Sequence, residues 1–378
     1  MRIAYLSSSI IPSRTANSIH VIRMCAAYAS LGHEVILFAP ERRKEAEKKV
    51  IDVYGFYGVP RTFEIRFLPW PRVRFRSLWY AWKLRGALNK LRPDLIHSRF
   101  LPGSAWLPRG KSISIFESHA PITDESRIQG AFLSWLCRRE VVSGLVVISH
   151  ALADRTLKDG LIPHEKLLVA PDGADFPPTD LVPFSFPGTG TRLQVGYIGQ
   201  LYAGKGMELI GRLALLVPGV DFHIVGGMEN DLALWKSKVI APNITFHGFV
   251  EPAKVPAYIA GLDVCLLPNQ RDVRTFTTGS RETQNIAGYT SPLKLFEYMA
   301  HGKAIVASRL PVLQEILNES LAVLADPELP EEWKECIQQL SDPKFRARLG
   351  GAAREVFTSQ FSWQARAGNV MNFVRTLQ

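Results

Sequence analysis

Short apolar runs alternate with longer amphipathic segments along most of this chain. The runs are four or five residues long and read as buried strands, whereas residues 19–31 and 207–216 repeat apolar positions at helical spacing. Strands separated by helices predict parallel sheets covered on both faces. The expected strands are residues 3–6, 34–38, 95–97, 114–116 and 145–148, and then 194–198, 221–225, 243–246, 264–267 and 304–307.

The alternation is interrupted once, between residues 176 and 191. Four prolines and two glycines fall in this stretch, so regular structure is not expected there. We therefore predict two Rossmann-like α/β domains with parallel sheets that face a central cleft. The predicted boundaries are residues 1–178 for the N-terminal domain, 179–191 for the linker, and 192–360 for the C-terminal domain. Residues 361–378 are predicted as a C-terminal helix, capped by Ser362, that packs back on the first domain.

The composition fits a globular protein, with 47% hydrophobic and 21% charged residues. We see neither a secretory signal peptide nor an apolar stretch of about 20 residues that would span a membrane, so a cytoplasmic location is expected. No Cys-x-x-Cys pair occurs, and reduced core cysteines are the simplest interpretation. The cysteines are Cys25, Cys137, Cys265 and Cys336.

Positive charge is concentrated in residues 41–92. This segment holds fourteen Lys/Arg and five Asp/Glu, a difference of +9, whereas the whole chain carries +10. Aromatic side chains are interleaved with the cations, which suits an anionic membrane surface. Single-stranded nucleic acid and an ordinary solvated basic face over core aromatics are the alternatives. Among the aromatics of the segment are Phe67, Trp70, Phe75, Trp79, Tyr80 and Trp82.

Two segments of the second half carry candidate chemistry. In Tyr289-Thr-Ser-Pro-Leu-Lys-Leu-Phe-Glu, Ser291 is an expected N-cap and Pro292 an expected first helical residue, so the helix N-terminus would favour an anion. Glu297, about one and a half turns into that helix, is suited to vicinal hydroxyls. In Gly199-Gln-Leu-Tyr-Ala-Gly-Lys-Gly, the glycines permit close backbone approach and Lys205 offers a charge for phosphate oxygens.

Together these segments resemble those of retaining glycosyltransferases of family 4, which have the GT-B fold. The resemblance also includes Asp221-Phe-His-Ile-Val-Gly-Gly, Gly261-Leu-Asp-Val-Cys-Leu-Leu-Pro and, in the first half, Ala16-Asn-Ser-Ile-His-Val and Val169-Ala-Pro-Asp-Gly-Ala-Asp. It extends over roughly residues 1–375 and implies transfer of a sugar from a nucleoside diphosphate with retention of anomeric configuration. It also implies that the N-terminal domain binds the acceptor and the C-terminal domain binds the nucleotide sugar.

The resemblance also implies residue roles. Lys205 would neutralise the leaving diphosphate, Glu297 would hold the ribose, and His119 in Phe116-Glu-Ser-His would lie beside the donor sugar. His119 and Lys205 are thus the expected catalytic residues. The expected donor-binding residues are Gly199, Gln200, Lys205, Tyr289, Ser291, Pro292, Leu293 and Glu297.

The sequence departs from the family pattern at three places. Tyr289 stands where the family has a glutamate that reads the donor sugar, Gln200 stands where an arginine is common, and Ala16-Asn17 replaces a glycine pair. The donor sugar therefore cannot be carried over. The polar loop 269–288 is a hypothetical source of replacement cations, namely Arg271, Arg274 and Arg281.

No Asp-x-Asp pair occurs, so we expect neither a metal nor another cofactor, and fixed cations are expected to stabilise the departing diphosphate. Attack from the face of the leaving group is the implied mechanism. The expected partners are a nucleotide sugar, a hydroxyl acceptor for which a lipid-linked molecule is a hypothesis, and an anionic membrane surface; nucleic acid is not expected. A sugar-nucleotide 2-epimerase and a non-catalytic nucleotide-sugar-binding protein are the alternative functions.

Overall fold

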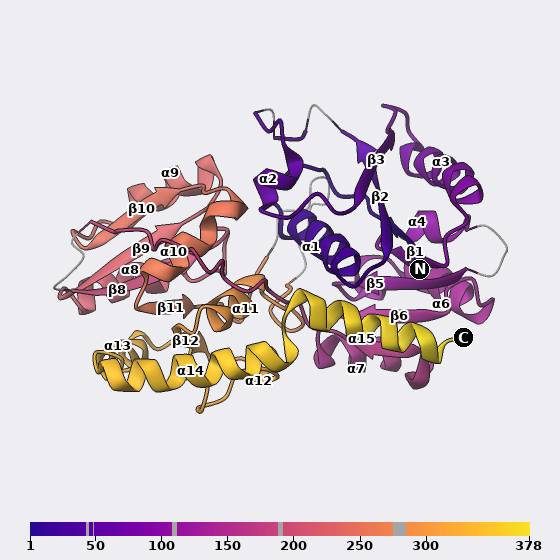
Figure 1. The fold of residues 1–378 in the computed structure, drawn as a ribbon. Coiled ribbons are helices and arrows are strands. Elements are labelled where there is room, and N and C mark those ends of the chain that lie inside the picture. The colour runs from indigo at the N-terminus through magenta and orange to yellow at the C-terminus, as the bar shows by residue number, and fades with distance from the viewer. Residues whose placement is uncertain (43–44, 48, 108–111, 188–191, 275–284) are drawn as a thin grey trace. The chain divides into compact units, whose positions relative to one another are not determined.

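The chain forms two compact units, each built on its own parallel sheet (Figure 1). The computed structural model describes all residues except 43–44, 48, 108–111, 188–191 and 275–284. Unit 1 comprises Met1–Asp172 and Trp363–Gln378, and unit 2 comprises Gly173–Ser362.

Unit 1 contains a seven-stranded sheet in the order β3-β2-β1-β4-β5-β6-β7, in which neighbouring strands are parallel. Its described strands are β1 (Arg2–Leu6), β2 (Glu34–Glu41), β3 (Glu64–Pro69), β4 (Leu95–Ser98), β5 (Ile113–Ser118), β6 (Gly144–Val147) and β7 (Leu167–Val169). Its described helices are α1 (Ala16–Ser30), α2 (Val53–Tyr57), α3 (Arg76–Leu91), α4 (Leu101–Ser104), α5 (Ile122–Glu125), α6 (Arg127–Arg138), α7 (His150–Lys158), the short η1 (His164–Lys166) and α15 (Trp363–Thr376).

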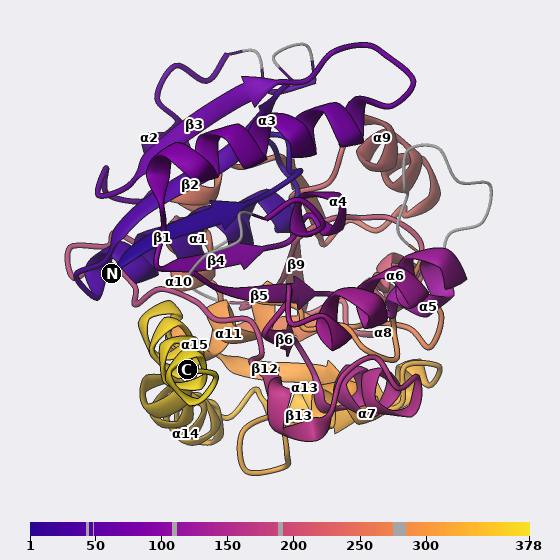
Figure 2. The same ribbon diagram turned by 90° about the vertical axis from the view of Figure 1, so that its right-hand side faces the viewer.

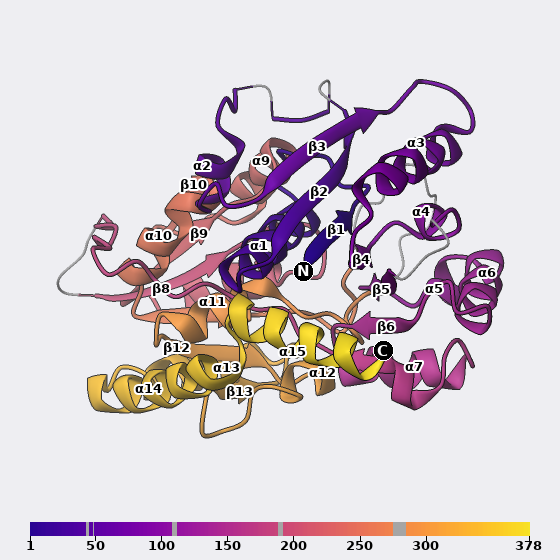
Figure 3. The same ribbon diagram turned by 45° about the vertical axis from the view of Figure 1, so that its right-hand side comes forward.

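Helices cover both faces of this sheet. Helix α15, the last of the chain, packs beside α1, as Figures 1 and 3 show. Helix α4 contacts both α3 and α6, and Figure 2 shows these three along one side of the unit. The two helix layers explain why β1, β2 and β4 are almost continuously buried, as parallel strands between helices require.

Unit 2 contains a six-stranded parallel sheet in the order β10-β9-β8-β11-β12-β13. Its described strands are β8 (Leu193–Ile198), β9 (Val220–Val225), β10 (Ile244–Gly248), β11 (Val264–Leu267), β12 (Ala304–Ser308) and β13 (Val323–Ala325). Its described helices are α8 (Met207–Leu216), α9 (Glu229–Lys238), η2 (Pro252–Lys254), α10 (Val255–Gly261), α11 (Leu293–Ala300), α12 (Pro311–Gln314), α13 (Pro330–Gln339) and α14 (Pro343–Gln360).

The structure confirms the predicted fold class and every strand predicted from an apolar run, with ends that differ by at most three residues. Residues 176–187 form neither helix nor strand, as expected, and the rest of that stretch lies outside the described residues. All four cysteines are free and buried. Strands β3, β7 and β13 and helix α3 were not predicted. None of the described helices has the length and apolarity that crossing a bilayer requires.

Candidate functional site

The loop from Gly199 to Gly206 leaves the carboxyl end of β8 and enters α8. Gly199, Gly204 and Gly206 have φ of +151°, +84° and +83°, a region that side chains disfavour. A Cβ at Gly204 would lie 2.1 Å from the Asp272 carbonyl oxygen, and one at Gly206 would lie 2.2 Å from that of Pro268. Because these positions are glycines, the loop packs directly against neighbouring backbone.

Lys205 lies in this loop with only 6% of its surface exposed. Its ammonium is 5.1 Å from the centre of the Tyr202 ring, and it makes no hydrogen bond or ion pair with any described residue. Desolvation lowers the pKa of Lys205 to about 8. A buried cation of this kind is costly to fold unless an anion joins it.

A second lysine, which the sequence analysis treated only as part of a helix, lies against the same loop. Lys294 Nζ donates to the Tyr197 hydroxyl at 2.7 Å and lies 3.9 Å from the centre of that ring. The Tyr197 hydroxyl in turn donates to the Gln200 carbonyl at 2.6 Å. A Cβ added at Gly199 would come within 2.7 Å of Lys294 Nζ. The Lys294 ammonium thus lies directly beside the first residues of the loop.

The other predicted donor-binding residues lie in helix α11 or directly before it. The helix begins one residue later than predicted. Pro292 is its N-cap, with ψ of 119°, and no side chain caps the helix. The prediction that Ser291 is the N-cap and Pro292 the first helical residue is therefore wrong, because Pro292 keeps an extended ψ. Leu293 is the first helical residue and Glu297 the fifth, whereas Tyr289 lies in a turn before the helix.

The proposed replacement cations of the polar loop have carboxylate partners. Arg271 contacts Asp326 at 2.7 Å and Glu328 at 3.3 Å, and Arg274 contacts Asp272 at 3.0 Å. Residue 281 lies outside the described residues. Since both described arginines are exposed and already paired, Lys205 and Lys294 are the stronger candidates for binding an anion in unit 2.

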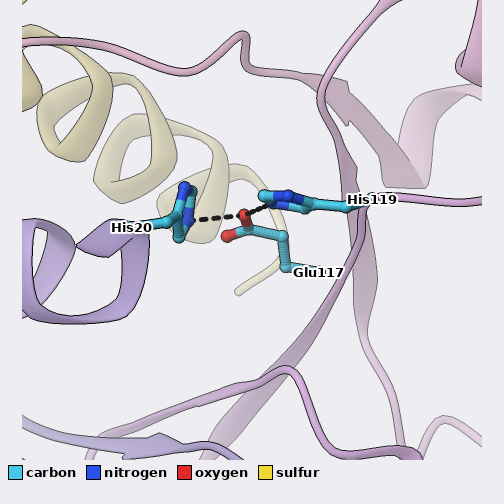
Figure 4. Close-up of side chains that lie close together, drawn as sticks. All are labelled: His20, Glu117 and His119. Atoms are coloured by element: carbon cyan, nitrogen blue, oxygen red, sulfur yellow. Dashed lines mark hydrogen bonds and ion pairs between the residues drawn. The ribbon is translucent and has the colours of Figure 1, made fainter. Parts of the chain in front are cut away.

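In unit 1, a buried carboxylate gathers several polar side chains (Figure 4). Glu117, near the end of β5, has its Oε1 2.8 Å from His20 Nε2 and 2.5 Å from His119 Nε2. The other nitrogen of His20 lies 2.7 Å from Asp172 Oδ1. His20 belongs to α1, His119 follows β5 and Asp172 follows β7, so the sheet brings together residues distant in sequence.

Two further side chains complete what we call the Glu117 cluster. His97 Nε2 lies 2.7 Å from Glu117 Oε2, and its Nδ1 lies 2.9 Å from the Tyr28 hydroxyl. Arg366 of α15 donates to Glu117 Oε1 at 3.1 Å and to the carbonyls of Pro171 and Ala170 at 2.9 and 3.1 Å. The cluster is Glu117, His20, His97, His119, Asp172 and Arg366.

The electrostatics of the cluster fix its protonation. Burial alone would raise the pKa of Glu117, but Arg366 and then His20 hold it well below its ordinary value. Desolvation, assisted by Arg99, lowers the pKa of His119 to about 3 despite its contact with Glu117. His119 is therefore neutral near pH 7, and it is the partly exposed member, with 23% of its side chain accessible.

His20, Glu117 and His119 are also close enough together to hold a metal ion. The Arg366 guanidinium, however, already supplies a positive charge 3.1 Å from the same carboxylate oxygen. A cation at this position would be repelled by Arg366, so the arrangement is better suited to orienting His119 than to binding a metal.

Of the predicted site residues, the structure gathers Gly199, Gln200 and Lys205 in one loop and places Leu293 and Glu297 in α11. Sequence reasoning missed Glu117, although it directly precedes the quoted Ser-His pair, and it also missed Lys294. The signal available for Glu117 was a carboxylate within a strand that is otherwise buried. Arg366 gave no such signal, because a single arginine in an amphipathic helix is ordinarily solvated.

Two family models match the chain. Glycosyltransferase Family 4 matches residues 18–176, and Glycosyl transferases group 1 matches residues 192–342. The first range contains most of the Glu117 cluster, and the second contains the glycine-rich loop and α11.

Among curated proteins, the chain is 26% identical over 298 residues to a GDP-mannose-dependent alpha-mannosyltransferase of Mycolicibacterium smegmatis, covering 72% of this chain and 74% of that protein. It is 29% identical over 118 residues to the putative teichuronic acid biosynthesis glycosyltransferase TuaH of Bacillus subtilis. That match spans 31% of this chain and only 27% of TuaH.

Among solved structures, HepE of Anabaena in complex with UDP and glucose is similar, with a TM-score of 0.73 and 16% identity. The likeness covers 99% of each chain and concerns the fold.

Proposed function

Because the chain belongs to glycosyltransferase family 4, whose retaining enzymes transfer a sugar from a nucleotide sugar on a GT-B fold, we propose that it glycosylates a hydroxyl group in the synthesis of a glycan, lipopolysaccharide or glycolipid. The observation that carries this proposal is the burial of the Lys205 ammonium in the glycine-rich loop. A buried ammonium that has no partner among the described residues, in a glycine-rich loop at the carboxyl end of a parallel strand, is suited to a diphosphate.

The proposed chemistry follows from charge. Negative charge accumulates on the departing diphosphate, and a fixed ammonium in a desolvated loop stabilises it more than water would. The C1–O bond to the diphosphate breaks while the acceptor hydroxyl attacks from the same face, and the acceptor proton passes to the departing phosphate. Glu297 accepts hydrogen bonds from the ribose hydroxyls, and the backbone amides near Leu293 contact the phosphates.

His119 is proposed to lie beside the donor sugar. Its contact with Glu117 fixes the imidazole, and its low pKa keeps it neutral, so it is suited to hydrogen bonding with sugar hydroxyls rather than to neutralising phosphate. Arg366 acts on this histidine through Glu117, and Asp172 acts through His20. His20 acts both through Glu117 and by direct contact, with the two ring centroids 4.6 Å apart.

The function is tested by a screen of nucleotide sugars. The screen begins with UDP- and GDP-hexoses, since HepE was solved with UDP and the mycobacterial relative is named GDP-mannose-dependent. We expect one donor to raise the unfolding temperature and to release its nucleoside diphosphate in an acceptor-dependent reaction whose product retains the anomeric configuration. Conversion of the donor sugar without an acceptor would instead indicate an epimerase, and binding without nucleotide release would indicate a non-catalytic protein.

We also propose that the enzyme works at an anionic membrane surface with a lipid-linked acceptor. The support is an aromatic–basic face on unit 1. Phe75, Trp79 and Trp82, at the start of α3, are 65%, 44% and 49% exposed, and Lys83 lies 4.8 Å from the centre of the Trp82 ring. Between residues 65 and 93 the sequence has eight Lys/Arg and no Asp/Glu.

Exposed apolar side chains also occur on a helix outside the segment that the sequence singled out. Helix α6 contacts α4, which in turn contacts α3. Ile128 and Trp135 of α6 are exposed, and the Arg139 guanidinium lies 5.7 Å from the centre of the Trp135 ring. Of the segment's aromatics, Tyr57 and Tyr80 are fully buried and Phe56 and Phe63 nearly so, and the interpretation as core aromatics under a solvated basic face applies to these four. Rings that remain exposed beside cations suit lipid headgroups.

Substitution of the two tryptophans tests this face. We expect the wild-type enzyme to sediment with phosphatidylglycerol-containing vesicles at low salt, and less so as salt rises. Replacing Trp79 and Trp82 together by glutamate is expected to reduce partitioning at least about tenfold, because two anchors are lost and two repulsive charges are added. Ile240→Glu, at an equally apolar exposed position of unit 2, is the control and should bind as wild type. Salt-independent binding, or tighter binding to single-stranded oligonucleotide than to vesicles, would overturn the proposal.

A further inference from the structure

The glycine-rich loop of unit 2 has a basic side chain at each of its two ends. Lys205 is the last residue but one of the loop. Lys294, in the first turn of α11, places its ammonium beside Gly199, the first residue of the loop. We propose that Lys294 and Lys205 together form a two-ammonium site for the diphosphate of the donor, with Lys294 as a further diphosphate-binding residue. This inference rests on the proposed function, because it names a residue of the same donor site.

The first argument is the placement of Lys294 relative to its own helix. It is the second residue of α11, where the helix dipole is positive and an anion, rather than a cation, is stabilising. Its hydrogen-bond partner is the neutral Tyr197 hydroxyl, and no described carboxylate lies within ion-pair distance of its ammonium. The position is therefore unfavourable for a lysine unless an anion joins it.

The second argument is that two positive charges share this region. Desolvation and then the charge of Lys205 lower the pKa of Lys294 well below its ordinary value, and the carboxylate of Glu297 opposes this only in part. Repulsion between two desolvated ammonium groups is relieved by a ligand that carries two or more negative charges, such as a diphosphate.

The third argument is that Lys294 is held in place. Its contact with Tyr197 is both a hydrogen bond and a cation–π contact, and the same hydroxyl fixes the Gln200 carbonyl. The ammonium is thus positioned before any ligand arrives, which lowers the entropy lost on binding. Gly199 is required here, since any side chain would displace the ammonium.

Calorimetric titration with inorganic pyrophosphate, UDP, GDP and ADP tests the site. We expect Lys294→Met to weaken binding of pyrophosphate and of the preferred nucleotide about 10- to 100-fold. At pH about 8, above the phosphate pKa of about 6, the nucleotide itself is ionised. Wild type is expected to take up protons on binding, because the diphosphate raises the pKa values of both lysines, and Lys294→Met should take up fewer.

Proton uptake is measured from the dependence of the binding enthalpy on the buffer. Lys303→Met is the matched control: Lys303 is also a partly buried lysine of unit 2, but it donates to the carbonyls of Ala260 and Leu262. Its loss should change stability and leave proton uptake as in wild type. Lys294→Gln is the second variant, should the methionine variant fail to fold.

Two outcomes separate the claims. If wild type binds a diphosphate and the Lys294 variants bind it with unchanged affinity and proton uptake, Lys294 is excluded and the proposed function stands. If wild type binds neither pyrophosphate nor any of the three nucleotides, the donor site and the proposed function fail together.

Discussion

Glu117→Gln is expected to lower the free energy of unfolding of unit 1 by about 3–5 kcal/mol and to abolish most activity. The carboxylate is fully buried and faces His20, His97, His119 and Arg366. The glutamine amide that replaces it is neutral. Its NH₂ group would face either the side chains at Oε1 or His97 at Oε2, and an NH₂ group cannot accept their hydrogen bonds. Arg366, 3% exposed, is then a buried cation that retains only Asp172 as a nearby anion. Urea unfolding measures the change.

The control for this variant is an exposed pair in the same unit. Glu64 contacts Arg66 at 2.6 Å, and both are solvent-accessible, so Glu64→Gln should change stability by less than about 1 kcal/mol. Adding Arg366→Met to Glu117→Gln should recover part of the loss, because the unpaired buried charge is removed as well. A Glu117→Gln protein within about 1 kcal/mol of wild type would show that the cluster contributes little.

Lys205→Met is expected to lower turnover while raising stability. Loss of a charged contact to the departing diphosphate should reduce kcat at least about tenfold and up to about 10³-fold. Folding lowers the pKa of Lys205 from 10.5 to about 8, which corresponds to a cost of about 3 kcal/mol. Both states are protonated at pH 7, so methionine removes this cost in full. Lys236→Met, an exposed lysine of α9, is the control and should change neither quantity.

The pH dependence distinguishes this role from a structural one. Wild-type stability should rise between about pH 8 and 10.5, as the folded lysine loses its proton before the unfolded one does. Over the same range kcat/KM should fall, because a neutral amine does not neutralise the diphosphate. In Lys205→Met both trends should be weaker, because only Lys294 remains to titrate in the site. Turnover equal to wild type in this variant would remove Lys205 from the mechanism.

The fold was predictable because each strand is a compact apolar run, and burial between two helix layers requires that pattern. Strand β3 was not predicted because it lies at the edge of the sheet and is mostly exposed, and the charged residues Glu64 and Arg66 interrupt its apolar positions. The glycine-rich loop was predictable for a different reason: positive φ at three positions strongly restricts the residue type.

The Glu117 cluster was not predictable from local sequence. Arg366 reaches Glu117 across a separation of 249 positions, and nothing near either residue indicates the other. Lys294 was hidden for a related reason, since its ammonium is brought to Gly199 by strand β8 and helix α11, which adjoin only in the folded unit. In both cases the informative property is a buried charge, which depends on tertiary packing.

Arg366 also has a consequence for how the protein is made. Unit 2 is inserted between β7 and α15 of unit 1, so a ribosome synthesises all of it before the helix that bears Arg366. During that interval Glu117 has no guanidinium beside it, and the sheet around it carries an uncompensated negative charge. We therefore expect unit 2 to reach its native state first, although it is encoded second, and unit 1 to mature only after α15 has been synthesised.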